Sequence, residues 1–237
     1  STLFPYTTLF RSRTGDPLIQ GSTARLMQAA AETGVGVIFG RGIAYGPEPL
    51  SKAFAAPMPA KRAAAHLYPD GVIYLIRAMN FTPSMALYRR GGLSGALPLP
   101  PDLVSCQDLA LLFPVLKRMR LASIDEPVCF SLQGAPNRLS ANHALTLQQT
   151  MRITQRNAQL LSSAHKRAAL LKSANRTRRW LRKARPESNF LAWQAWLLGI
   201  AVGARLGLVD FSRTLEKIAK VYERELQPIL DRRARPF

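Results

Sequence analysis

The sequence is poor in cysteine, and one long interval of it contains no acidic residue. Its 237 residues include only two cysteines, Cys106 and Cys129, too few for a disulfide framework or a cysteine-based metal site. A reducing compartment is therefore the simpler expectation for the protein. No Asp or Glu lies between Glu126 and Glu187, so the charged side chains of this interval are all basic.

The excess of positive charge is large and belongs mainly to this later part of the chain. The sequence has 33 Lys and Arg against 14 Asp and Glu, a formal net charge of +19. Such a charge predicts an anionic partner: nucleic acid, an anionic membrane surface or a phosphorylated substrate. No known DNA- or RNA-binding motif is present, which disfavours nucleic acid. A basic helical nucleic-acid-binding module stays open as an alternative function.

No apolar run reaches the ~20 residues that a bilayer-spanning helix needs. The longest charge-free apolar stretch, residues 190–204, contains Trp193 and Trp196. One interpretation is a buried helix packed on residues 211–226. Another is a monotopic anchor, with this helix in the bilayer interface and the preceding basic helix on anionic head groups. A third interpretation is a helix that spans the membrane. For the protein as a whole, a non-catalytic membrane-attached scaffold is a further alternative function.

The first twelve residues have neither an initiator Met nor the order of parts found in a signal peptide. They read STLFPYTTLFRS, which is identical to one translated frame of a widely used sequencing adapter. We therefore expect residues 1–12 to be an artefact without stable packing of their own. We also expect an upstream portion of the natural protein to be missing.

Before about Gln133 the sequence predicts alternating helices and strands. A helix ends at Gly34 after a plausible N-cap at Ser22, and a second helix with Ser105 as its N-cap covers residues 106–119. Short apolar runs predict strands at residues 35–39, 72–76, 84–88 and 128–131. Residues 40–59 are expected to be loop, and residues 61–67 a short helix.

After Gln133 the pattern becomes helical. Apolar residues at helical spacing predict one long helix over residues 144–185, followed by helices at 190–207 and 211–232. The predicted fold is therefore α/β followed by a helical segment. We place the α/β domain at residues 13–133 and the basic helical segment at residues 134–237.

Three stretches of the α/β part resemble the second half of a family 2 glycosyltransferase with a GT-A (Rossmann-like) fold. They are Thr82–Arg90 (TPSMALYRR), Leu103–Leu112 with Gln107-Asp108-Leu109, and Ile124–Phe130 (IDEPVCF). The resemblance extends over about residues 16–145. It implies an inverting transfer of sugar from a nucleotide-diphosphate donor to a hydroxyl acceptor, such as a surface polysaccharide or a lipid-linked glycan. A cytoplasmic bacterial location is implied, with peripheral attachment to the inner face of the membrane as an alternative.

The same resemblance assigns roles to individual residues. Gln107-Asp108 stands where the family has a Glu-Asp pair, so Asp108 is the expected catalytic base. The start of a helix is expected to hold its carboxylate ionised. Gln107, Thr82 and Ser84 are the expected neighbours in the acceptor site. The alternative for Asp108 is that it merely favours the first turn of its helix.

The family also uses a divalent metal, Mg²⁺ or Mn²⁺, held by an Asp-x-Asp motif. The only counterpart is Asp16, which the resemblance identifies as the trailing carboxylate of that motif; an ordinary Asp at a helix start is the alternative. The nucleotide-binding strands that precede the motif in the family have no counterpart in the sequence. We therefore expect the fragment to be inactive alone.

Overall fold

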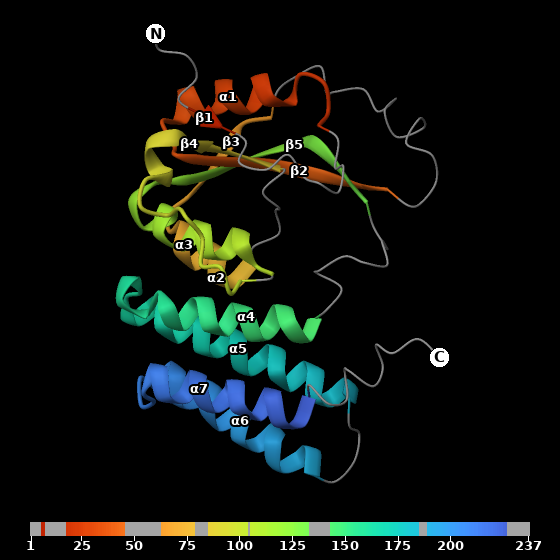
Figure 1. The fold of residues 1–237 in the computed structure, drawn as a ribbon, viewed down its shortest axis with the longest axis vertical. Helices are drawn as coiled ribbons and strands as arrows, with labels where there is room; N and C mark the ends of the chain where they lie inside the picture. Colours follow the sequence, from red (N-terminus) through yellow and green to blue (C-terminus); the bar gives the residue numbers. More distant parts are fainter. Residues whose placement is uncertain are drawn as a thin grey trace. The chain divides into compact units, whose positions relative to one another are not determined.

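The computed structural model describes residues 6–7, 18–45, 63–78, 85–103, 105–132, 143–184 and 189–226. The chain divides into two compact units (Figure 1). The first contains Ser1–Pro100 and Ala110–Arg138, and the second contains Pro101–Leu109 and Leu139–Phe237. The first unit is mixed α/β and the second is helical, so the predicted fold class is confirmed.

A mixed sheet forms the centre of the first unit. Its strands lie in the order β1-β4-β2-β5-β3. They are β1 (Tyr6–Thr7), β2 (Val37–Tyr45), β3 (Ala65–Tyr68), β4 (Ala86–Arg89) and β5 (Leu121–Leu132). The central pair, β2 and β5, is parallel, and the other pairs are antiparallel. β1 is the only described part of residues 1–12, and the expectation that those residues are an artefact stays untested.

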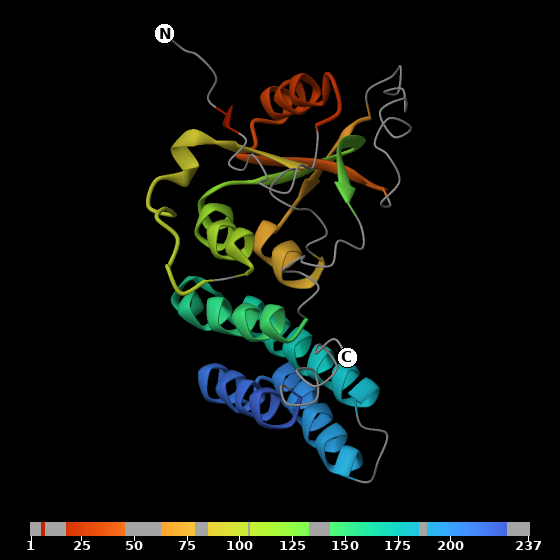
Figure 2. The ribbon, with the colours of Figure 1, turned by 45° about the vertical axis from the view of Figure 1, so that its right-hand side comes forward.

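Helices cover both faces of this sheet. α1 (Ser22–Thr33) lies on one face, and α2 (Gly71–Ala78) and α3 (Gln107–Arg118) lie on the other (Figures 1 and 2). A short 3-10 helix, Arg90–Leu93, follows β4. The buried side chains of these layers include Ile38, Leu87, Phe113, Leu121 and Ile124.

One acidic side chain lies inside this core. Glu126 on β5 is fully buried, and its carboxylate accepts a hydrogen bond from Nη1 of Arg25 on α1 at 3.0 Å. The other carboxylate oxygen accepts the backbone N–H of Ala63 at 2.6 Å. A buried charge is tolerable when it is paired and hydrogen-bonded in this way. The contact fixes α1 and the chain before β3 to the sheet.

Two short elements have the opposite type to the one predicted. Residues 65–67, expected in a helix, lie in β3, which pairs with β5. Residues 72–76, expected as a strand, lie in α2. Asp70 explains the second error, because its side chain accepts the N–H of Ile73 at 2.9 Å and so caps the helix start. A five-residue apolar run alone does not distinguish helix from strand.

The start of the predicted loop at residues 40–59 is also wrong. β2 continues through Gly40 to Tyr45, with a register shift at Arg41. A Cβ atom built on Gly40 would lie 2.3 Å from Cγ1 of Val128 and 2.8 Å from the carbonyl oxygen of Glu126. Glycine is therefore required here by close approach to β5, and in a strand it marks such an irregularity rather than a loop.

The second unit consists of α4 (His143–Arg156), α5 (Ser163–Ala184), α6 (Asn189–Leu206) and α7 (Phe211–Val221), with a π-helical turn over Tyr222–Leu226. α5 packs most extensively on α6, and it also contacts α4 and α7. The single helix predicted over residues 144–185 is wrong. It is broken before α5, where Ser162 and His165 cap the new helix start by reciprocal side-chain to backbone bonds.

Candidate functional site

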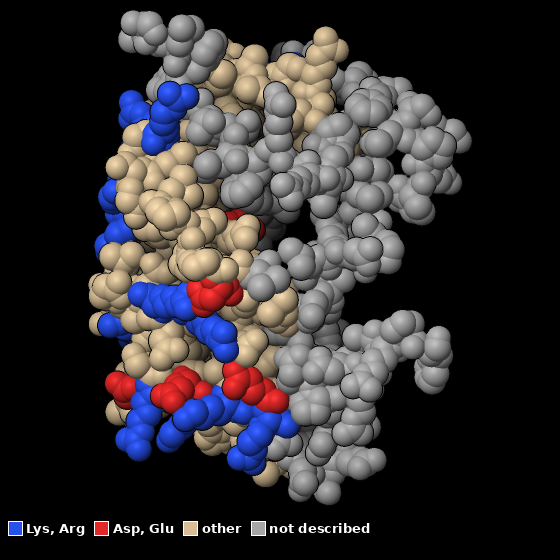
Figure 3. All heavy atoms as spheres, viewed as in Figure 1, with Lys and Arg blue, Asp and Glu red and all other residues tan. Residues whose placement is uncertain are grey.

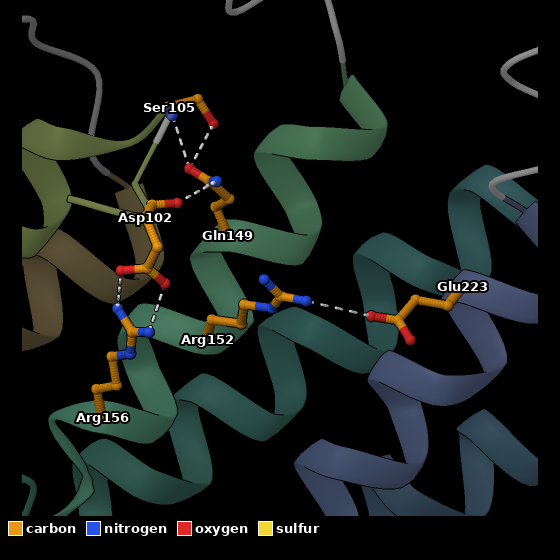
Figure 4. Close-up of polar contacts among 6 residues, drawn as sticks. All are labelled: Asp102, Ser105, Gln149, Arg152, Arg156 and Glu223. Carbon is orange, nitrogen blue, oxygen red and sulfur yellow. Dashed lines mark hydrogen bonds and ion pairs between the residues drawn. The ribbon is translucent and has the colours of Figure 1, made fainter. Parts of the chain in front are cut away.

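The segment Pro101–Leu109, which leads into α3, is fastened to α4 by a buried amide (Figure 4). Oε1 of Gln149 accepts the backbone N–H of Ser105 at 2.6 Å and lies 3.3 Å from its hydroxyl oxygen. Nε2 of Gln149 donates to the carbonyl oxygen of Asp102 at 3.4 Å. Because the Ser105 hydroxyl is engaged with Gln149, Ser105 does not have the capping role expected from the sequence.

An exposed ion pair in the second unit forms another link between the Pro101–Leu109 segment and α4. The guanidinium of Arg156 donates two hydrogen bonds to the carboxylate of Asp102, at 2.9 and 2.5 Å. These bonds lower the pKa of Asp102 and raise the pKa of Arg156. One turn earlier on α4, Arg152 lies 3.9 Å from the carboxylate of Glu223 (Figure 4). α4 is therefore anchored to both the segment and the end of the helical unit.

Cys106 occupies a constrained position directly before α3. Its φ angle is 58°, in the left-handed region that side chains rarely adopt. Its Sγ lies 3.5 Å from the carbonyl oxygen of Thr146 and 3.6 Å from Oγ1 of Thr150. Burial raises the pKa of the thiol, which keeps it in the protonated, weakly nucleophilic form. The residue therefore fits a packing role rather than nucleophilic catalysis.

Asp108 is half-buried in the first turn of α3, and Oδ1 accepts the backbone N–H of Leu109 at 2.8 Å. Within the described ranges, no Lys or Arg forms an ion pair with it, despite the large positive charge of the chain. Burial raises the pKa of Asp108 above its ordinary value near 3.8, and this outweighs the opposing backbone hydrogen bonds. The sequence led us to expect that the helix start would favour the ionised carboxylate. Burial, which favours the neutral carboxyl group, has the larger effect on the pKa of Asp108. A carboxylate with a raised pKa is a stronger proton acceptor once it is ionised.

Of the other predicted site residues, only Gln107 lies within the described part of the chain. Gln107 is exposed, and its Nε2 donates to the carbonyl oxygen of Leu103 at 3.1 Å. Thr82, Ser84 and Asp16 lie outside the described residues. Of the predicted set, the structure therefore places only Gln107 and Asp108, at the first two positions of α3.

A metal site is not assembled by the part of the chain that the structure describes. There, no three His, Cys, Asp or Glu side chains come together in a way that could hold a metal ion. Asp16, the one predicted ligand, lies outside the described residues. The divalent metal that the family resemblance implies therefore stays a prediction.

The contribution of the Gln149 hydrogen bonds to the stability of the protein can be measured by substitution. Gln149→Leu removes the acceptor of the buried Ser105 N–H, so we expect the free energy of unfolding to fall by about 1–3 kcal/mol. Gln148→Leu is the matched control, since its amide makes an exposed bond to Glu223 at 2.7 Å; its effect should stay within about 0.5 kcal/mol. Denaturant unfolding of both variants measures the difference, and equal effects would show that the buried amide fastens nothing.

No protein-family model matches the sequence, and no curated protein matches it at a significant level. Among solved structures, the chain is similar to the crystal structure of residues 1–349 of S. aureus TarS, with 13% sequence identity and a TM-score of 0.46. The match covers 88% of this chain and 64% of that chain.

Proposed function

We propose that the chain is part of an inverting glycosyltransferase in which Asp108 is the catalytic base. The donor is a nucleotide-diphosphate sugar, and the acceptor is a hydroxyl group of a surface polysaccharide or a lipid-linked glycan. The observation that supports this best is the state of Asp108: a half-buried carboxylate with no cationic partner among the described residues and a raised pKa. Carboxyl groups with perturbed pKa values are more frequent at functional sites than elsewhere.

The proposed reaction is a single displacement. Asp108 accepts the proton of the acceptor hydroxyl while the hydroxyl oxygen bonds to the anomeric carbon of the donor sugar. The bond from that carbon to the diphosphate oxygen breaks, and the nucleoside diphosphate leaves with the electron pair. Because attack and departure occur on opposite faces of the carbon, the anomeric configuration inverts.

The surrounding residues position this base. The double fastening of Pro101–Leu109 to α4, through Gln149 and Arg156, limits movement of the chain that carries Asp108. A base held in place contributes more to the rate than a mobile one. Gln107, Thr82 and Ser84 stay proposed neighbours of the acceptor. A Mg²⁺ or Mn²⁺ ion held with the help of Asp16 would neutralise the charge of the leaving diphosphate.

The test is sugar transfer by the protein made from the full open reading frame that contains residues 13–237. It should release nucleoside diphosphate from a nucleotide sugar and produce a glycoside of inverted anomeric configuration, as read by NMR. A retained configuration would contradict the single-displacement chemistry, and failure with every nucleotide sugar tried would contradict the proposed class.

A further inference from the structure

The solvent-facing side of α6 is unusually apolar. Leu191, Leu198, Val202 and Leu206 have 72%, 51%, 49% and 65% of their surface exposed. They recur at helical spacing, so they form one stripe, which we call the α6 stripe. The exposed residues beside them are Ala192, Ala195, Gly199 and Arg205, so Arg205 is the only charged residue on this face among those described.

The opposite side of α6 is apolar as well. Leu197, Ile200 and Ala204 are buried on the side where α6 packs against α5. A helix that is apolar all round is normally covered by protein or lipid. No helix in the described ranges is long and apolar enough to cross a bilayer. A helix lying in the plane of the bilayer interface requires no such length.

Basic side chains border the stripe at both ends. Nε2 of Gln194 donates to the carbonyl oxygen of Arg178 at 3.0 Å, which places the last turns of α5 beside the first half of α6. Arg179 and Arg182 are exposed on those turns, and Arg205 lies at the other end of α6. Arg179 and Arg182 belong to the interval between Glu126 and Glu187 that contains no Asp or Glu.

The surface of α7 has a different character. Acidic and basic side chains lie among one another over α7 in Figure 3, and Glu216 and Lys220 pair at 2.7 Å. This pair neutralises only Glu216 and Lys220, and Arg213 and Lys217 leave α7 with further positive charge. The basic border of α6 is the more suitable region for an anionic surface because it lies beside the exposed apolar stripe.

We propose that the α6 stripe binds the surface of an anionic lipid bilayer. The helix lies in the interface, with the apolar side chains of the stripe at the boundary between head groups and acyl chains. Arg179, Arg182 and Arg205 lie at the level of the lipid phosphates. Trp193 and Trp196, both half-buried with ring centroids 5.7 Å apart, are of the type that favours this interface. Charge complementarity selects lipid over a second copy of the chain, because each copy carries a net charge of +19.

Vesicle flotation tests this inference independently of sugar transfer. The full chain should float with phosphatidylcholine vesicles that contain phosphatidylglycerol, and only weakly with phosphatidylcholine alone. The double variant Leu198→Gln/Val202→Gln should lower the affinity for anionic vesicles about tenfold or more, because two apolar contacts are lost. Leu67→Gln, at an exposed leucine of the first unit, is the matched control and should leave binding unchanged. Arg179→Gln/Arg182→Gln should weaken binding to anionic vesicles, and so should added salt.

Thermal unfolding of each variant separates binding from folding, since substitution of exposed residues should leave the midpoint unchanged. Equal flotation of the wild type and the double variant would overturn the proposal. So would a concentration-dependent dimer that the double variant abolishes while neither protein floats, which would make the stripe a contact between copies. Binding to single-stranded RNA but not to anionic vesicles would also overturn it.

Discussion

Replacement of Asp108 by Asn is expected to lower kcat by ~10²–10⁴-fold, the usual contribution of a positioned general base. Asn has the same shape, and its side-chain oxygen can still accept the N–H of Leu109, but it cannot take a proton from the acceptor. The KM for the nucleotide sugar should change little, because the proposed base contacts the acceptor hydroxyl. Steady-state kinetics of the protein made from the full open reading frame measure both quantities.

Asp125→Asn is the matched control for this substitution. The Asp125 side chain is 81% exposed and pairs with Arg41 at 2.6 Å on the surface, so we expect near-normal turnover. The folded Asp108→Asn protein should be at least as stable as the wild type at neutral pH, since it no longer buries an ionisable carboxyl group. Near-normal turnover of Asp108→Asn together with an inactive Asp125→Asn would show that the base is assigned to the wrong residue.

The largest expected loss of stability follows from removal of the buried carboxylate of Glu126. Glu126→Ala should lower the free energy of unfolding by about 3–5 kcal/mol, because it breaks the ion pair between a fully buried carboxylate and Arg25. The backbone N–H of Ala63 loses its acceptor at the same time. Urea unfolding measures the change.

The neighbouring exposed pair provides the comparison for Glu126. Asp125→Ala breaks the contact with Arg41, and an exposed ion pair contributes at most about 1 kcal/mol. The two substitutions therefore remove carboxylates at adjacent positions of β5, one of them buried and the other exposed. Comparable losses for both would show that burial of Glu126 has no special importance for the fold.

Periodicity predicted the elements whose apolar pattern is long enough to be unambiguous. The helices at Gln107–Arg118 and Asn189–Leu206 lie within one or two residues of the predicted limits. The pattern failed where a single capping side chain decides the structure. Asp70 converts an apolar run into α2, and Ser162 starts α5 inside what the sequence presents as one continuous helix.

The environment of the candidate site was less accessible from the sequence. Asp108 was identified through a family resemblance, but the burial that raises its pKa depends on tertiary packing. Gln149 and Arg156 were missed because their partners, Ser105 and Asp102, lie 44 and 54 positions away along the chain. No local pattern identifies such pairs, since a Gln or Arg on a helix is normally solvated.

The most direct test of Asp108 as the base is the dependence of kcat on pH in the wild type and in Asp108→Asn. A base must be deprotonated, so the wild-type rate should fall as the pH is lowered through the raised pKa of Asp108, above its ordinary value near 3.8. Circular dichroism at each pH shows that the protein stays folded. In Asp108→Asn the residual rate should no longer show this acidic fall. The same fall at the same pH in the variant would contradict the account, because another group would then be the titrating base.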